Sequence, residues 1–244
     1  MKICAVSDMH GIYDFKIPEV DILFICGDIV PLRMQRNIPQ SLSWLQKEFI
    51  PWCQSLPVTQ IFMVGGNHDF FLENKPDIYK YFLGTKIIIL YNESAEYLDN
   101  DGKLWTVWGS PLCHIFGNWA FMYSDEYNKE QFEKMPKNVD FLITHDCGYE
   151  MSDQCLGFSY DYDRELHRGN KPLAEVVKEK EPFFHFTGHL HTANHNIKNY
   201  GNTHTANVSL VDEYYRRTFE PLVLAVDKDL EGKISFQTES YQSK

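Results

Sequence analysis

Short runs of hydrophobic residues recur along the chain, and many of them end abruptly at glycine or at an acidic residue. Runs that are apolar throughout, without alternation, are typical of strands buried on both faces in α/β proteins. The pattern predicts strands at Ile3–Val6, Asp21–Cys26, Thr59–Val64, Lys86–Leu90, Val139–Thr144, Phe183–Thr187, Thr203–Leu210 and Leu222–Val226, with an edge strand at Ile234–Thr238.

Segments with helical spacing lie between these runs. Within Ile38–Leu56 the apolar residues fit one helical face, and Pro51 is expected to end or kink that helix. Further helices are predicted at Pro76–Leu83, Asn128–Met135 and Lys171–Lys180. Tyr97–Leu98 and Leu104–Trp108 flank an Asp-Gly turn and predict a hairpin. Strands and helices alternate first and hairpins follow, which predicts one α/β domain with mixed sheets over residues 1–244.

The bulk composition narrows the class of protein. The 244 residues are 43% hydrophobic and 23% charged, as in ordinary globular proteins, and the formal net charge is -11. That charge argues against binding a long nucleic-acid duplex. Six cysteines without CxxC spacing predict no disulfide framework. The first apolar run is too short for a signal peptide or membrane span, so a cytoplasmic location without a membrane partner is expected.

Residues that bind metals follow five of the predicted strands. They are Asp8 and His10, Asp28, Asn67 and His68, His145, and His189 with His191. Because parallel strands of an α/β sheet present their ligands at their carboxyl ends, these side chains are expected to converge. Five of the ten histidines fall in this pattern. An extended segment would point His189 and His191 the same way.

Each of these motifs alone has an ordinary explanation. Asp-x-His can be incidental, Gly-Asp can be a turn, and a single His145 can be a hydrogen-bonded core residue. Gly66-Asn67-His68-Asp69 directly after a strand is the strongest single motif. It is the ordered combination that predicts a metal site, since the other five histidines follow no comparable rule.

The ordered set Asp8-x-His10, Gly27-Asp28, Gly66-Asn67-His68-Asp69, His145 and Gly188-His189-x-His191 resembles the calcineurin-like metallophosphoesterase superfamily. The resemblance implies a four-layer α/β/β/α sandwich with a dinuclear metal centre at the strand ends. Gly109-Ser110-Pro111 and the stretch from Phe116 to Phe121 resemble the small phosphodiesterase branch of MPPED proteins.

The resemblance also implies a role for each site residue. Asp8, His10 and His191 would bind the first metal, Asn67, His145 and His189 the second, and Asp28 both. Mixed imidazole and carboxylate ligands suit Mn, Fe, Zn or Co. Two such ions about 3.5–4 Å apart hold a hydroxide for in-line attack on a phosphate ester.

His68 and Asp69 are predicted to act on the substrate side. His68 would assist departure of the leaving group, which general acid catalysis accelerates by about 10²–10⁴-fold. Alternatively, His68 only hydrogen-bonds a phosphate oxygen. Asp69 would be the hydrogen-bond partner of His68, or else a helix N-cap.

Two subclasses of the superfamily fit poorly. Protein serine/threonine phosphatases carry an arginine before Asn-His, where this chain has Gly66. Purple acid phosphatases carry a tyrosine ligand where this chain has Pro31.

Several further residues are candidates for substrate contact, each with an alternative. His114, together with Asn67 and His68, could reach the substrate, or it belongs to a surface loop. The aperiodic segment from Cys147 to Asn170 is long enough to be functional, and it offers phosphate-binding or solvated charges. These charges are Arg164, His167 and Arg168. Trp119, Phe121 and Tyr123 form either an aromatic wall or part of the core.

The sequence thus predicts a metal-dependent phosphoesterase, preferably a phosphodiesterase, acting on a small phosphate ester. A metal-binding scaffold without catalysis is the rival from another class, and a phosphomonoesterase or nuclease is the rival within the superfamily. No pattern in the sequence predicts an oligomeric state.

Overall fold

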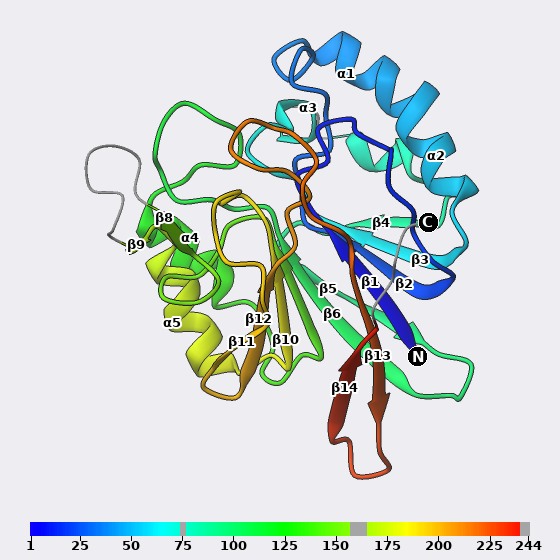
Figure 1. Ribbon diagram of the computed structural model, residues 1–244, viewed down its shortest axis with the longest axis vertical. Coiled ribbons are helices and arrows are strands. Elements are labelled where there is room, and N and C mark those ends of the chain that lie inside the picture. The colour runs from blue at the N-terminus through cyan, green and yellow to red at the C-terminus, as the bar shows by residue number, and fades with distance from the viewer. Residues whose placement is uncertain (74–76, 157–164, 240–244) are drawn as a thin grey trace.

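The first of two large sheets combines the first four strands of the chain with the last two. The computed structural model describes residues 1–73, 77–156 and 165–239 (Figure 1). The strand order is β14-β13-β1-β2-β3-β4. The bounds are β1 Lys2–Val6, β2 Val20–Ile25, β3 Val58–Met63, β4 Ile87–Ile89, β13 Leu222–Lys228 and β14 Ile234–Thr238. β1 to β4 are parallel, whereas β13 and β14 pair antiparallel at one side.

The second sheet has the order β11-β12-β10-β7-β6-β5. The bounds are β5 Glu93–Leu98, β6 Leu104–Ser110, β7 Phe141–Thr144, β10 Phe184–Thr187, β11 Lys198–Tyr200 and β12 Thr203–Asn207. The four inner strands are parallel, and β11 and β5 are antiparallel at the two edges. The predicted hairpin is confirmed as β5–β6, with Leu98 opposite Leu104.

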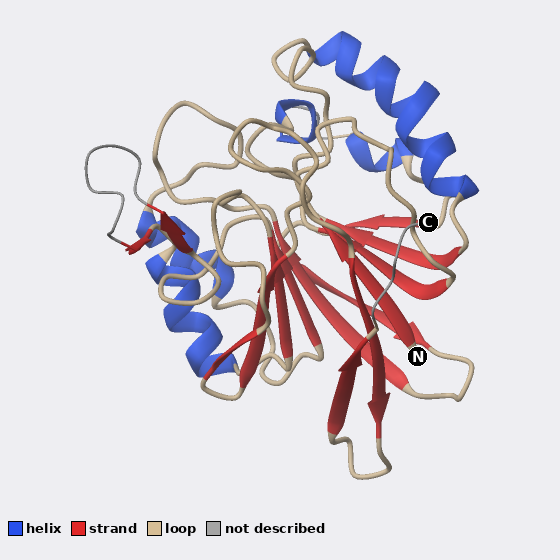
Figure 2. Ribbon diagram, in the orientation of Figure 1, coloured by secondary structure: helices blue, strands red, loops and turns tan. Residues whose placement is uncertain are grey.

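Three apolar layers hold the sheets and helices together. Phe24 of the first sheet lies 5.2 Å from Phe141 and 5.3 Å from Phe186 of the second, between ring centroids. Such aromatic pairs contribute about 0.5–1.5 kcal/mol each beyond the area that they bury. Helices cover the outer face of each sheet, on opposite sides of the molecule (Figure 2). The predicted four-layer α/β/β/α sandwich is therefore confirmed.

One long helical segment packs on the first sheet, and two further helices pack on the second. The long segment comprises α1 Ile38–Trp44, a π-helical turn Leu45–Phe49 and α2 Ile50–Ser55. The helix therefore continues through Pro51, because the wider turn just before it accommodates the residue that lacks an N–H. On the other side α5 spans Lys171–Lys180, as predicted, and α4 spans Asp125–Phe132. α4 begins earlier than predicted because Ser124 caps it, accepting a hydrogen bond from the Tyr127 N–H.

The remaining elements are short. α3 spans Phe70–Glu73, and a 3₁₀ turn at Ile78–Tyr81 replaces the helix predicted from Pro76, a residue outside the described ones. The segment predicted to be aperiodic contains a two-stranded ribbon of β8 Gln154–Leu156 and β9 Glu165–His167. Strand β11 was not predicted.

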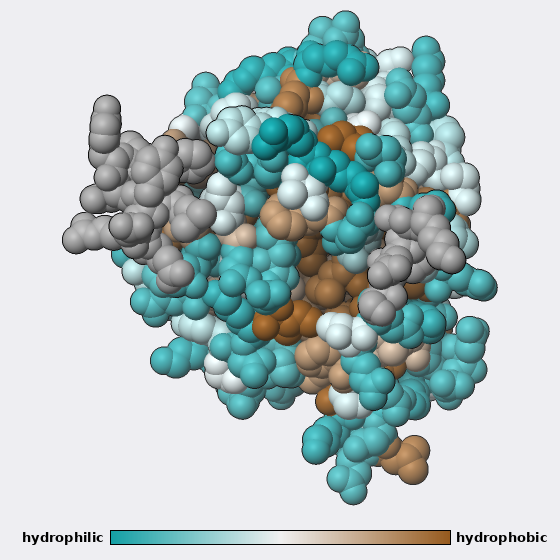
Figure 3. All heavy atoms as spheres, in the orientation of Figure 1, coloured by the Kyte–Doolittle hydropathy of each residue, from teal (hydrophilic) through white to brown (hydrophobic). Residues whose placement is uncertain are grey.

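The surface is mostly hydrophilic on the face shown in Figure 3, with hydrophobic residues gathered near its middle. All six cysteines are buried free thiols. Among the described helices, none combines the length and the apolar character needed to cross a bilayer.

Candidate metal centre

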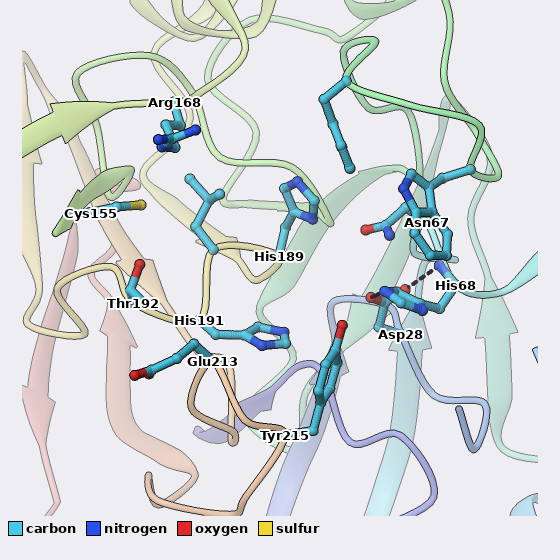
Figure 4. A pocket seen from close by; sticks show the side chains of 13 residues that line it. Asp28, Asn67, His68, Cys155, Arg168, His189, His191, Thr192, Glu213 and Tyr215 are labelled. Atoms are coloured by element: carbon cyan, nitrogen blue, oxygen red, sulfur yellow. Dashed lines mark hydrogen bonds and ion pairs between the residues drawn. The ribbon is translucent and has the colours of Figure 1, made fainter. Parts of the chain in front are cut away.

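Five parallel strands deliver the predicted ligands to one edge of the sandwich. β1, β2 and β3 are neighbours in the first sheet, and β7 and β10 are neighbours in the second. Since each pair runs parallel, the residues that follow the strands lie at the same end. The close-up in Figure 4 shows several of these side chains around one cavity.

Four of the predicted ligands adopt left-handed backbone conformations. The φ angles are 54° at Asp8, 45° at His10, 53° at Asp28 and 67° at His189. Residues other than glycine rarely adopt such angles, which cost about 1–3 kcal/mol and cluster at functional sites. The turn at His189 also corrects the prediction of an extended segment. As a result His189 faces His145, at 5.1 Å between ring centroids, whereas His191 faces His10, at 5.8 Å.

Two glycines allow the backbone to approach the ligands closely. A Cβ on Gly66 would lie 2.2 Å from Asp28 Oδ1, and a Cβ on Gly188 would lie 2.4 Å from Asp8 Oδ2. Both distances are too short for any side chain. The two glycines therefore bring the strand ends close enough to form a single site.

Asp8, His10 and His191 form the first group that could hold a metal. One potential ligand atom from each lies within 4.8 Å of the others. His191 Nε2 is 3.1 Å from Asp8 Oδ1, and His191 Nδ1 is 3.1 Å from the Asp212 carbonyl oxygen. Both ring nitrogens of His10 are buried without a hydrogen-bond partner among the described residues. A buried polar atom of this kind requires a partner, and a cation fits this one.

Asp28 joins this group to the second. It forms one potential metal group with His10 and His68, and another with Asp8 and His145. Its Oδ2 lies 3.3 Å from His145 Nε2 and 3.9 Å from His10 Nε2. This central position suits a carboxylate shared by two ions.

Asn67 and His189 complete the predicted second set. His145 Nε2 is 2.9 Å from Asn67 Oδ1, so an imidazole nitrogen and an amide oxygen converge there. Its Nδ1 is 2.8 Å from the carbonyl oxygen of Cys26, which fixes the ring. His189 belongs to none of the three groups among the described residues, although its ring borders His145.

Ionisation at the site produces the forms that bind metals, a charged carboxylate at Asp28 and neutral imidazoles at His10 and His189. Burial opposes ionisation of Asp28, but the charges of His145 and His68 hold its pKa well below the usual range. Burial lowers the pKa of His10 and of His189 to about 4, so both imidazoles are neutral near pH 7. Burial also opposes a charge on His145, yet attraction to Asp28 raises its pKa to about 10. The donor set and its orphaned nitrogens fit the predicted metals.

His68 stands beside this centre, with its Nε2 3.8 Å from Asp28 Oδ2. Its backbone N–H donates to Asp28 Oδ1 at 2.7 Å, the contact dashed in Figure 4. Its Nδ1 contacts Gln35 Oε1. Gln35, which the sequence analysis did not predict, thus holds the His68 ring at its Nδ1 side.

Asp69 has a different role from the one predicted. Its buried carboxylate accepts hydrogen bonds from the backbone N–H groups of Ile29 at 3.2 Å, Val30 at 3.0 Å and Gly66 at 2.9 Å. The described residues show neither a pairing with His68 nor a helix N-cap. Asp69 instead ties the loop after β3 to the loop after β2.

A cavity of about 250 Å³ opens above the ligands. Its wall consists of Asp28, Asn67, His68, Phe116, Trp119, Cys155, Arg168, His189, Leu190, His191, Thr192, Glu213 and Tyr215. Of the predicted aromatic wall only Trp119 lies here, 4.7 Å from His68 between ring centroids. Phe121 is buried in the core and Tyr123 packs on Tyr127.

Of the other candidates for substrate contact, the structure places some at this cavity and others elsewhere. His114 pairs with the buried Asp146, Nδ1 to Oδ2 at 2.8 Å, and lines a neighbouring cavity. His167 pairs with Asp153 at 2.8 Å, whereas Arg168 reaches the metal-site cavity. Arg164 lies outside the described residues. Tyr215 and Glu213 were missed, because they lie far along the chain in a segment without a motif.

Comparisons with known proteins support the fold. One crystal structure aligns with a TM-score of 0.64 at 18% identity, covering 98% of this chain and 99% of its own. Phosphopantetheinyl hydrolase from Mycobacterium tuberculosis aligns with a TM-score of 0.51 at 15% sequence identity, covering 88% of this chain and 90% of its own. GAP50, the anchor in the inner membrane complex of Plasmodium, aligns with a TM-score of 0.52 at 12% sequence identity, covering 100% of this chain and 90% of its own. No curated protein sequence matches significantly.

A family model decides the relationship that these low identities leave open. The model described as calcineurin-like phosphoesterase matches residues 1–193, which include every predicted metal ligand. This chain therefore belongs to the calcineurin-like phosphoesterase family.

Proposed function

We propose that this protein is a metal-dependent hydrolase of phosphate esters, with phosphodiesters as its preferred substrates. The observation that carries the proposal is the convergence of three overlapping His/Asp groups, two of which include Asp28, with both nitrogens of His10 left without a hydrogen-bond partner among the described residues. Asp8, His10 and His191 would hold one metal ion, and Asn67, His145 and His189 a second, with Asp28 between them.

Metal ions bound there would supply Lewis-acid activation of water and would neutralise phosphate charge. The residues of the chain supply orientation and a proton. Gln35 holds the Nδ1 side of His68, while His68 lines the cavity beside Asp28. In the proposed reaction His68 donates a proton from Nε2 to the oxygen of the leaving group.

The shape and chemistry of the cavity support a diester over a monoester. Phe116 and Trp119 give its wall an apolar side next to His189 and His68, where a second ester substituent would lie. Arg168 and Glu213 provide polar contacts farther along the wall. The resemblance of residues 109–111 and 116–121 to the MPPED branch favours the same substrate class.

The experiment is a turnover assay of the purified protein loaded with Mn²⁺, using bis-p-nitrophenyl phosphate and p-nitrophenyl phosphate. We expect turnover of both, faster on the diester, and loss of turnover in chelator-treated protein. Mass spectrometry of the same samples would give the bound metals. Two bound metals without turnover of either ester would instead identify a non-catalytic scaffold. Hydrolysis of single-stranded DNA in preference to the small esters would identify a nuclease.

A further inference from the structure

Tyr215 reaches into the metal-site cavity from the loop between β12 and β13, coloured orange in Figure 1. Its φ angle is 59°, in the left-handed region. A bulky aromatic residue rarely adopts this conformation, which persists only where the surrounding contacts determine it. Something in the structure therefore holds Tyr215 in place.

The carboxylate of Asp212 holds the turn that carries this tyrosine. Its Oδ1 accepts hydrogen bonds from the backbone N–H groups of Tyr214 at 2.9 Å and Arg216 at 3.0 Å. Its Oδ2 accepts from the Arg216 guanidinium, from Nε at 2.9 Å and from an Nη at 2.7 Å. The Tyr215 N–H in turn donates to the Asp212 carbonyl oxygen at 2.9 Å.

The same turn is attached to the metal centre. The Asp212 carbonyl oxygen lies 3.1 Å from His191 Nδ1. The Leu210 N–H donates to the carbonyl oxygen of Ser7, the residue before Asp8, at 3.0 Å. One turn thus orients the ligand His191 and fixes the position of Tyr215 above it.

The phenol ring of Tyr215 is surrounded by the imidazoles of the site. Its centroid lies 5.0 Å from that of His10, 5.2 Å from that of His191 and 6.1 Å from that of His68, all nearly perpendicular. In Figure 4 the hydroxyl points from the loop toward Asp28 and His68. No hydrogen bond between described residues involves this hydroxyl, which lines the cavity and can donate to a bound ligand.

We infer that Tyr215 contacts the substrate, donating a hydrogen bond from its hydroxyl to a non-bridging oxygen of the phosphoryl group. This inference rests on the proposed function, because the proposed function is what places a phosphoryl group beside Asp28. A phenol carries one O–H donor, and the position of this one in the cavity aims it at the place where the phosphoryl group would bind. A preorganised donor aimed at developing charge stabilises the transition state.

The test compares Tyr215→Phe with Tyr214→Phe in metal-loaded protein. Tyr214 is the matched control, because it is the adjacent tyrosine, is 68% exposed and packs against Arg216. We expect Tyr215→Phe to lower kcat on bis-p-nitrophenyl phosphate by about tenfold to a hundredfold, as for a hydrogen bond to a charged group. Bound metal and thermal midpoint should match the wild type, and Tyr214→Phe should leave kcat unchanged.

A binding measurement separates this inference from the proposed activity. Titration calorimetry of metal-loaded protein with inorganic phosphate should show weaker binding to Tyr215→Phe than to the wild type, by about tenfold. If the wild type binds phosphate but hydrolyses no ester, the proposed function fails while this comparison still decides the role of Tyr215. Equal phosphate affinity of Tyr215→Phe and the wild type would overturn the inference, as would an unchanged kcat.

Discussion

The edge of the two sheets that carries the candidate metal ligands and the loops that form the rest of the cavity wall are built in different ways. Asp8, Asp28 and His145 lie within three residues of the ends of buried strands and are themselves buried. Phe116 and Tyr215 lie on loops and are 47% and 37% exposed. The positions of the edge residues are thus fixed by the sheets, whereas the other cavity residues lie on loops that can vary without disturbing the sheets. We expect the edge to decide whether phosphate esters are cleaved, and the wall to decide which ones.

Removing the charge at the centre of the edge should have the largest effect. Asp28→Asn keeps the shape of the side chain but removes the carboxylate that we propose lies between two metal ions. We expect loss of bound metal and a fall in kcat of about 10³-fold or more, since metal ions contribute several kcal/mol. Metal content and turnover are the measurements, with the surface variant Asp227→Asn as control. Full metal content in Asp28→Asn would contradict the assigned position.

His68→Ala should separate the chemistry of the edge from its metals. We expect metal content and fold to remain while kcat falls by about 10²–10⁴-fold, the range of general acid catalysis. Gln35→Ala should give a smaller loss, because it only frees the ring that Gln35 holds. Steady-state kinetics with the Mn²⁺ form checks both variants. Full activity of His68→Ala would refute the role given to this histidine.

Metal binding at the edge should release protons. In the metal-free protein, Asp28 raises the pKa of His145 to about 10 and Asp8 raises that of His191, in each case against the effect of burial. At pH 7 His145 therefore carries a proton that a metal must displace. Because the pKa of His145 is about 10, affinity for Mn²⁺ should weaken about tenfold for each unit by which the pH falls below about 10, per proton displaced. Calorimetry in two buffers of different protonation enthalpy measures the release. An identical heat in both buffers would show that no proton leaves.

A change in the wall should have the smallest effect and should depend on the substrate. Trp119→Leu removes the aromatic surface next to His68. We expect KM for bis-p-nitrophenyl phosphate to rise by about threefold to tenfold, as aromatic contacts of about 0.5–1.5 kcal/mol imply. A dimethyl phosphate ester should respond less. Ile115→Ala, at an exposed residue outside this cavity, is the control. An equal effect on both esters would argue against selection by the wall.

Much of the fold and of the edge could be predicted because both depend on local sequence. An apolar run followed by Gly-Asp or Gly-Asn-His is a strand that ends in ligands, whatever its neighbours are. The prediction was wrong where backbone torsion mattered, since nothing near His189 indicates that its φ angle is 67° rather than extended. It was wrong for Asp69 as well, because the backbone amides of Ile29 and Val30 lie about 40 residues earlier in the chain.

The sequence by itself determined the alternation of strands and helices, the family and the types of candidate ligand, because these follow from hydrophobic periodicity and from residues next to strand ends. Only the tertiary structure decided that Gln35 contacts His68, that Asp212 joins His191 to the turn of Tyr215, and that Trp119 rather than Phe121 lines the cavity. The physical reason is that these contacts join loops far apart in the chain. Their geometry is set by how the two sheets pack, and no local pattern records it.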